Sequence, residues 1–274
     1  MRALAWFQAL LAVLIVVGRT SSAGAQPAVP NEFLDNTNRQ GGNRIDFCVN
    51  MTSPLAEFDR FVGQAIAEAL LVEASFYEVD APWAAEPLDY RIGLTESELF
   101  VILNNHCDAF LGFSLSPLST PPWMRLSLPY LTTRFVLLAT TEGVRFADLP
   151  EGAAIGTLLG TTADGDMRRY LSVTGPALRR LPYPNNLILL ERLNENAIVA
   201  ALVWEPAAWA YLRTHPSRAV AEVTGLPFTP LEIAFSLAIR SDDQFLLAAV
   251  DLAIDALMED GTITAAAERL LNSN

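Results

Sequence analysis

The sequence predicts a mixed α/β fold made of two lobes. Residues 44–113 alternate short strand-like segments with segments of helical spacing, and the same alternation restarts at Arg134. Strands that alternate with helices favour a parallel sheet. The two series are similar in size and no low-complexity linker separates them, so we expect two lobes that hold a ligand at the carboxyl ends of their strands.

The first series contains three expected strands and two expected helices. The strands cover Arg44–Asn50, 74–80 and 108–113. The second helix covers 95–104, with Thr95 as its cap and Glu98 three residues later, as in a capping box. The first helix is expected from an apolar stripe at helical spacing, formed by Phe58, Phe61, Val62, Ala65, Ile66, Ala69 and Leu70.

The second series predicts four strands and four helices. The strands begin at Arg134 and cover 153–160, 197–204 and Glu232–Arg240. The segment 197–204 is an unbroken apolar run, which is typical of a buried strand. The expected helices cover 162–172, Asn186–Asn194, 244–260 and about 263–271, with Gly261 placed to end the third of them.

The N-terminal segment has the three parts of a secretory signal peptide. Arg2 precedes an apolar run at 3–17, and Ala23-Gly24-Ala25 forms a small-residue cleavage site. The run is shorter than the roughly 20 residues of a spanning helix, which disfavours the alternative of a membrane anchor. We expect residues 1–25 to be removed near Ala25/Gln26, a flexible leader at 26–43, and a periplasmic protein with no membrane insertion after cleavage.

Composition excludes several kinds of chemistry. The chain has 18 basic and 31 acidic residues; without Arg2 and Arg19, the mature net charge is −15, which disfavours nucleic-acid partners. Every basic residue is Arg, so there is no P-loop lysine or Schiff-base lysine. His106 and His215 are the only histidines, so a multi-histidine metal site is impossible. We expect no metal, no cofactor and no enzymatic activity.

Two cysteines, Cys48 and Cys107, remain in a chain that carries an export signal. An even number of cysteines in an oxidising compartment favours a disulfide. Two buried thiols are the alternative. If the first three strands are ordered 2-1-3, Cys48 and Cys107 lie on neighbouring strands, where their sulfurs can meet.

Three motifs in order resemble a known family. They are "HCDAFLGF" followed by "LSLPY" and "LTTRFVLLAT", then "AAIGTLLGTTADGDMRRYL", and finally "FSLAIRSDDQFLLAAVDLAIDALMEDGT". Together they resemble the bacterial extracellular solute-binding proteins of family 3, across most of residues 44–272. The resemblance implies a two-lobed type II periplasmic receptor that serves an ABC permease. Lobe one would comprise 44–133 plus 237–274 and lobe two 134–236, with hinge crossings near 131–134 and 235–239.

The amino-acid-binding members of that family hold their ligand between two charged groups. An Arg ten residues before the Tyr of the Pro-Tyr pair binds the carboxylate, and that position is Thr120 here. An Asp at the end of a late strand binds the ammonium group, and that position is Trp204, followed by Glu205. A neutral Thr cannot replace a bidentate Arg, so the resemblance implies a small ligand that is not a standard α-amino acid. Arg125 and Arg134 are the nearby cations, and surface or hinge ion pairs are the alternative for both.

The remaining candidate ligand residues follow strand ends. Phe113 and Ser114 follow the third strand, with ordinary loop packing as the alternative. Gly160, Thr161 and Thr162 open a helix whose N–H groups suit a polar or anionic group, although capping by Thr162 explains them equally well. Trp204 could stack on a ligand or be a core aromatic.

A divergent branch of the family shows a closer resemblance. The quinoprotein-dehydrogenase-associated proteins have a Cys in the first strand, a Cys-Asp at the third and a Val-Trp-x-Pro element. Cys48, Cys107-Asp108 and 203–206 match in turn, although the residue before Pro is usually Gly and is Glu205 here. This branch implies docking on a periplasmic dehydrogenase. A dehydratase-like enzyme on the same scaffold is a further alternative.

Overall fold

The structure is a computed structural model, and it describes residues 43–80, 94–114, 120–174, 178–230 and 232–272. Contacts divide the chain after Asp35, so all of these residues lie in one compact unit, Asn36–Asn274. The predicted signal peptide and nearly all of the predicted leader fall outside the described residues and stay predictions. Within the described part, no helix is long and apolar enough to cross a membrane.

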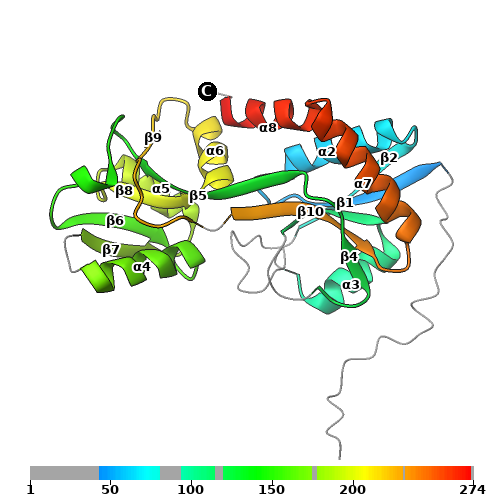
Figure 1. Cartoon of the computed structure of the whole chain (residues 1–274), viewed down its shortest axis with the longest axis horizontal. Helices are drawn as coiled ribbons and strands as arrows, with labels where there is room; N and C mark the ends of the chain where they lie inside the picture. The colour runs from blue at the N-terminus through cyan, green and yellow to red at the C-terminus, as the bar shows by residue number, and fades with distance from the viewer. Residues whose placement is uncertain (1–42, 81–93, 115–119, 175–177, 231, 273–274) are drawn as a thin grey trace, which may run out of the picture. The chain divides into compact units, whose positions relative to one another are not determined.

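Strands and helices alternate along most of the chain (Figure 1). The strands are β1 Arg44–Asn50, β2 Glu73–Val79, β3 Ala109–Ser114, β4 Met124–Leu126, β5 Leu131–Ala139, β6 Ala153–Leu158, β7 Leu178–Tyr183, β8 Ala200–Trp204, β9 Ala221–Glu222 and β10 Glu232–Arg240. The helices are α2 Ala56–Ala69, α3 Glu96–Asn105, η2 Phe146–Asp148, α4 Thr162–Thr174, α5 Asn186–Asn194, α6 Glu205–Thr214, α7 Gln244–Glu259 and α8 Thr262–Asn272.

The strands pair in the order β2-β1-β3-β10-β5-β8-β6-β7, with β4 paired to β10 and β9 paired to β5. Pairing is parallel within β2-β1-β3 and within β8-β6-β7, and β10 and β5 are antiparallel to their neighbours. β5 belongs to both groups of strands, because 131–134 pair with β10 and 135–138 pair with β8. Figure 1 shows β5 and β10 side by side. The lobe boundaries expected from the sequence stay predictions.

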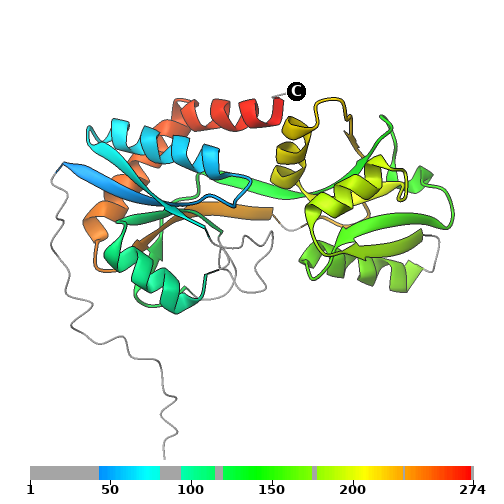
Figure 2. The same cartoon turned by 180° about the vertical axis from the view of Figure 1, so that it is seen from behind.

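The first group of strands separates two apolar clusters. Ile45, Phe47 and Val49 of β1 belong to the large cluster that includes residues of α2 and α7, whereas Cys48 belongs to a smaller cluster with Leu103 of α3. This is the period of two expected for a strand buried on both faces. Figure 2 shows α2 and α3 on opposite sides of these strands.

The structure confirms the predicted alternation and several boundaries. β1, α5 and β10 have the predicted limits, and Thr95 and Glu98 form the predicted capping box. Gly261 adopts a φ of 81° between α7 and α8, as a helix-ending glycine should. The apolar stripe predicted for α2 was partly wrong. Phe61 and Ala69 are exposed, and Asp59, which was not part of the predicted stripe, is buried.

The sequence analysis missed β4, β7, β9 and α6, and it began β8 too early. β7 reads "LRRLPY", whose arginines and proline hide the strand pattern; it lies at the end of the strand order, where proline is tolerated. Residues 197–199 precede β8 because Asn196 adopts a φ of 58° and the N–H of Ala197 donates to the carbonyl of Arg192, in a turn that ends α5.

Candidate functional site

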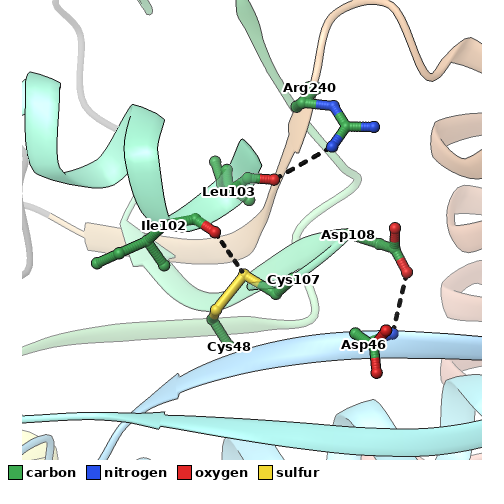
Figure 3. The surroundings of a disulfide bond; sticks show 7 residues. All are labelled: Asp46, Cys48, Ile102, Leu103, Cys107, Asp108 and Arg240. Carbon is green, nitrogen blue, oxygen red and sulfur yellow. Dashed lines mark hydrogen bonds between the residues drawn. A yellow bond between two sulfur atoms is a disulfide. The ribbon is translucent and has the colours of Figure 1, made fainter. Parts of the chain in front are cut away.

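Cys48 and Cys107 form the predicted disulfide, which joins β1 to the turn before β3. The sulfurs are 2.11 Å apart and the Cα atoms 5.6 Å apart. Figure 3 shows two flanking contacts: Asp108 Oδ2 accepts the N–H of Asp46 at 3.0 Å, and Arg240 Nη1 donates to the carbonyl of Leu103 at 3.2 Å. The bridge and these contacts fasten the amino end of β3 to β1 and α3 to β10. The predicted disulfide and the strand order 2-1-3 on which it depended are therefore both confirmed.

A bulge lies near the other end of β3, just before the candidate ligand residues. Ser114 pairs with Phe235 and Phe113 with Ser236, but Phe110 pairs with Ala238, so two residues of β3 oppose one of β10. Gly112 takes up the extra residue with a φ of 74°. Because of the bulge, Phe110 and Phe113 both belong to the smaller apolar cluster. Phe113 is buried and Ser114 is half-buried.

The bulge is bound by two side chains, Tyr130 and Asp59, that the sequence analysis did not propose as site residues. The N–H of Gly112 donates to the hydroxyl of Tyr130 at 2.7 Å, and that hydroxyl donates to Asp59 Oδ1 at 2.7 Å. Burial raises the pKa of Asp59 to about 7, and the hydrogen bond from Tyr130 acts in the opposite direction. The sequence did contain one signal for Asp59, because its carboxyl group lies on the apolar face of the predicted helix, where a buried polar group is expected to have a partner.

The turn before α4 holds Gly160, Thr161 and Thr162. Gly160 has a φ of 84°, Thr161 is buried, and Thr162 is the first residue of the helix. The cap is Thr161 and not Thr162 as the sequence analysis expected, because Thr161 Oγ1 accepts the N–H of Asp164 at 3.1 Å. The helix start is therefore already capped by its own residues, whether or not it also contacts a ligand.

Asp164, in the first turn of α4, has a cationic partner. It accepts Arg180 Nε at 2.6 Å and Nη2 at 3.0 Å, and Thr157 Oγ1 at 2.5 Å. Burial acts to raise the pKa of Asp164, but the hydrogen bonds from Arg180 and Thr157 outweigh it and leave that pKa below its usual value. Arg180 is thus engaged by Asp164.

Trp204 ends β8 as a fully buried aromatic. Its Nε1 donates to Thr133 Oγ1 at 2.9 Å, and its ring lies 5.8 Å from that of Phe235. Of the two alternatives that the sequence left open for Trp204, the structure shows the core aromatic. A buried indole whose N–H is hydrogen-bonded is a stable arrangement, and because it is neutral it cannot pair with a charged group of a ligand.

Glu205 is the first residue of α6, next to a group of charges on β5, β9 and β10. Burial raises the pKa of Glu205, and the charge of Arg134 opposes this rise. Arg134 forms two hydrogen bonds with Glu222, each of 2.9 Å. The ion-pair alternative for Arg134 is thus confirmed.

Thr120 is exposed, and Arg125 binds the main chain. Arg125 Nη1 donates to the carbonyl of Met124 at 2.9 Å. The guanidinium groups of Arg125, Arg134 and Arg180 therefore all have partners within the chain. None of these three guanidinium groups is therefore free to bind a ligand carboxylate.

The structure brings several candidate residues to one sheet edge. β6 and β8 are parallel neighbours, so Thr162 and Glu205, which follow their carboxyl ends, begin helices at the same edge. Phe113 and Ser114 belong to the other group of strands. Phe235 connects the two, since it pairs with Ser114 and its ring contacts Trp204.

Neither histidine forms part of these candidate sites. His106 stacks on Tyr77 with ring centres 4.3 Å apart, and His215 stacks on Tyr211 at 4.2 Å. His215 ends α6, the helix that Glu205 begins. In the described ranges, no group of three or more His, Cys, Asp or Glu side chains is arranged to hold a metal ion.

Comparisons with known proteins identify the fold. No family model and no curated protein matches the sequence. The L-cystine solute receptor of Neisseria gonorrhoeae, in its unliganded open conformation, matches with a TM-score of 0.62 and 18% identity, over 88% of this chain and 95% of that one. The fold is that of the two-lobed type II periplasmic binding proteins.

Two further solved structures agree. Substrate-binding domain 2 of GlnP from Lactococcus lactis has a TM-score of 0.63 and 13% identity, over 83% of this chain and 95% of that one. The GluR0 ligand-binding core in complex with L-glutamate has a TM-score of 0.55 and 14% identity, over 84% and 98%. At these identities the likeness shows the fold and not the ligand. None of the three is a quinoprotein-associated protein, so that branch stays a prediction.

Proposed function

We propose that the protein is a periplasmic solute-binding receptor that delivers a small ligand, other than a free α-amino acid, to an ABC permease. The fold supports the receptor role. The observation that carries the ligand proposal is the pair of residues at the two clamp positions: Thr120 is neutral and exposed, and Trp204 is neutral and fully buried. A receptor that closes on a zwitterion must pair both charges, and these residues cannot.

The engaged arginines support the same proposal. An arginine that replaced the missing clamp would need a guanidinium free to bind two carboxylate oxygens. Arg134 already binds Glu222 in this way, and Arg180 binds Asp164. The proposed ligand is therefore neutral, aromatic or weakly polar, with Phe113, Ser114, Thr161, Thr162 and Glu205 as its candidate contacts.

A thermal-melting panel on the mature protein tests the proposal. A ligand at 100 times its dissociation constant adds about 2.7 kcal/mol, which raises the midpoint by roughly 5–10 °C for a chain of this size. We expect no such shift with any common amino acid and a shift with at least one neutral metabolite. Ser114→Ala should reduce that shift. Ser172→Ala is the matched control, because Ser172 is exposed on α4 and its hydroxyl donates to the carbonyl of Arg169 in the same helix. A full shift with an amino acid would overturn the proposal.

A protein partner is the second candidate. The observation that favours it is the disulfide between Cys48 and Cys107, which joins the two cysteines that the quinoprotein-associated branch would share. In this case the protein would dock on a periplasmic alcohol dehydrogenase. Stoichiometric co-purification with a quinoprotein dehydrogenase, together with a flat melting panel, would favour this candidate. The dehydratase alternative has less support, because both histidines are stacked on tyrosines.

A further inference from the structure

A single hydrogen-bonded group fixes the bulge before the candidate ligand residues. Gly112 donates its N–H to the Tyr130 hydroxyl, and Tyr130 donates to Asp59. Gly112 belongs to β3 and Asp59 to α2, and Tyr130 is the residue just before β5. The carboxyl group of Asp59 packs directly against Gly112: a Cβ added to Gly112 would lie 2.6 Å from Asp59 Oδ2. Glycine is therefore required here by its φ and by the carboxyl group beside it.

The carboxyl group of Asp59 is buried and has no cationic partner in the part of the chain that the structure describes. Asp59 and Tyr130 are each 1% exposed, and no described residue forms a salt bridge with Asp59. α2 packs against β1, β2, β3, α7 and α8. β3 has no titratable residue. The other titratable groups on α2 and these elements are Glu57, Arg60, Glu68, Arg44, Asp46, Glu73, Tyr77, Glu78, Asp251, Asp255, Glu259, Glu268 and Arg269.

None of those groups is a cause of the perturbed titration of Asp59. Its pKa is set by burial, which raises it to about 7, and by Tyr130, which lowers it. The nearest cation along α2, Arg60, is bound to Glu78 of β2. Burial and Asp59 together raise the pKa of Tyr130 well above its usual value, so the phenol keeps its proton. Only Asp59 changes its proton number near neutral pH within this group.

We propose that Asp59 is a positioning residue for the Phe113–Ser114 segment, and that its protonation state sets the hydrogen-bond geometry of the Gly112 bulge. The role of that segment as a ligand contact rests on the proposed function. The positioning itself does not, because it follows from contacts present without a ligand.

The mechanism follows from the direction of the two hydrogen bonds. When Asp59 loses its proton, the carboxylate draws the hydroxyl proton of Tyr130 more strongly. The phenol oxygen then becomes a better acceptor for the N–H of Gly112, since linked hydrogen bonds polarise one another. The main chain one residue before Phe113 therefore responds to pH, although the titrating group lies on another element.

The N–H of Gly112 is the direct probe. In ligand-free, ¹⁵N-labelled mature protein between pH 5 and 9, we expect its amide proton to move downfield in a single step with a midpoint near 7. Asp59→Asn should remove the step. Tyr130→Phe should raise the exchange rate of this amide about tenfold, the equivalent of one lost hydrogen bond of about 1.4 kcal/mol. It should also move the carboxyl titration of Asp59 to higher pH, because Tyr130 lowers that pKa.

Two controls separate this role from general destabilisation. Asp255→Asn replaces an exposed carboxylate on α7 and Tyr77→Phe an exposed phenol, and neither should alter the step. If Asp59→Asn does not fold, the carboxyl ¹³C shift of Asp59 in the unsubstituted protein gives the midpoint directly. A midpoint near the ordinary value of about 4, or a step that persists in Asp59→Asn, would overturn the proposal. A flat melting panel would overturn only the proposed function.

Discussion

Asp59 and Asp164 occupy matching places in the two groups of strands, yet their surroundings differ. Each lies in the first turn of the helix that follows the first strand of its parallel group, β1 before α2 and β6 before α4. Both are less than a tenth exposed. Asp164 binds the guanidinium of Arg180, whereas the side-chain partner of Asp59 within the described ranges is the phenol of Tyr130.

The difference shows what decides the charge of a buried carboxyl group. Burial alone acts to raise the pKa of both residues, and in Asp164 the cation reverses the outcome. The two residues therefore stabilise the fold in opposite pH ranges. Asp164 loses its contribution as pH falls through its depressed pKa, and Asp59 begins to destabilise as pH rises above the value for an unfolded chain.

The largest expected effect comes from Asp59→Asn. Between the ordinary pKa of an Asp side chain, 3.8, and the raised pKa of Asp59, about 7, the folded protein holds a proton that the unfolded chain has lost, so stability falls as pH rises through this range. A shift of about three pH units corresponds to about 4 kcal/mol. Relative to the unsubstituted protein, Asp59→Asn should therefore gain about 4 kcal/mol in free energy of unfolding between pH 4 and pH 8, measured by urea titration.

This comparison cancels every other titrating group, because both proteins carry them. Asp255→Asn is again the control and should give a difference that stays within about 0.5 kcal/mol across the same range. A constant difference for Asp59→Asn would show that Asp59 is ionised throughout. The contrast with Asp164 would then disappear.

Removing the cation should make Asp164 resemble Asp59. Arg180→Met leaves a buried carboxylate with Thr157 as its remaining side-chain donor, and we expect a loss of about 3 kcal/mol at neutral pH. The pKa of Asp164 should rise, because burial then dominates. Arg179→Met is the control: Arg179 is exposed and donates to the carbonyl of Gly152, so its loss should cost about 0.5 kcal/mol or less. Equal losses for the two variants would contradict the assigned role of Arg180.

The smallest expected effects compare the hydroxyl partners of the two carboxyl groups. Tyr130→Phe leaves the N–H of Gly112 and Asp59 without their partner, so we expect a loss of about 2 kcal/mol. Thr157→Val removes one donor from Asp164, which keeps Arg180, and should cost about 1 kcal/mol. Urea titration at one pH near 6 ranks them, and the reverse order would show that Tyr130 is not the main support of the bulge.

Much of the fold could be predicted from local pattern. β1, α5 and β10 follow from periodicity alone, and the cap at Thr95 follows from Glu98 three residues later. The disulfide followed from export and from strand order. β4 and β9 have three and two residues, too few for any periodicity, and their pairing depends on strands far along the chain.

The site was harder to predict because its contacts are long-range. Asp59 and Tyr130 are 71 residues apart, and no local spacing reports a hydrogen bond across that distance. Asp164 and Arg180 are 16 residues apart on neighbouring elements, which the missed strand β7 concealed. A sequence pattern did place Trp204 at a strand end, but whether an indole faces a ligand or the core depends on packing that the pattern does not contain.

The position of β10 in the strand order affects how the chain can assemble. β3 pairs with β1 on one side and with β10 on the other, and β10 is more than a hundred residues further along. In a chain exported from its N-terminus, as proposed for this protein, that edge of β3 stays open until nearly the whole chain has emerged into the oxidising compartment. An open edge invites wrong pairing. The bridge between Cys48 and Cys107 can close much earlier, and it fixes the register of β1 and β3 while their last neighbour is still absent.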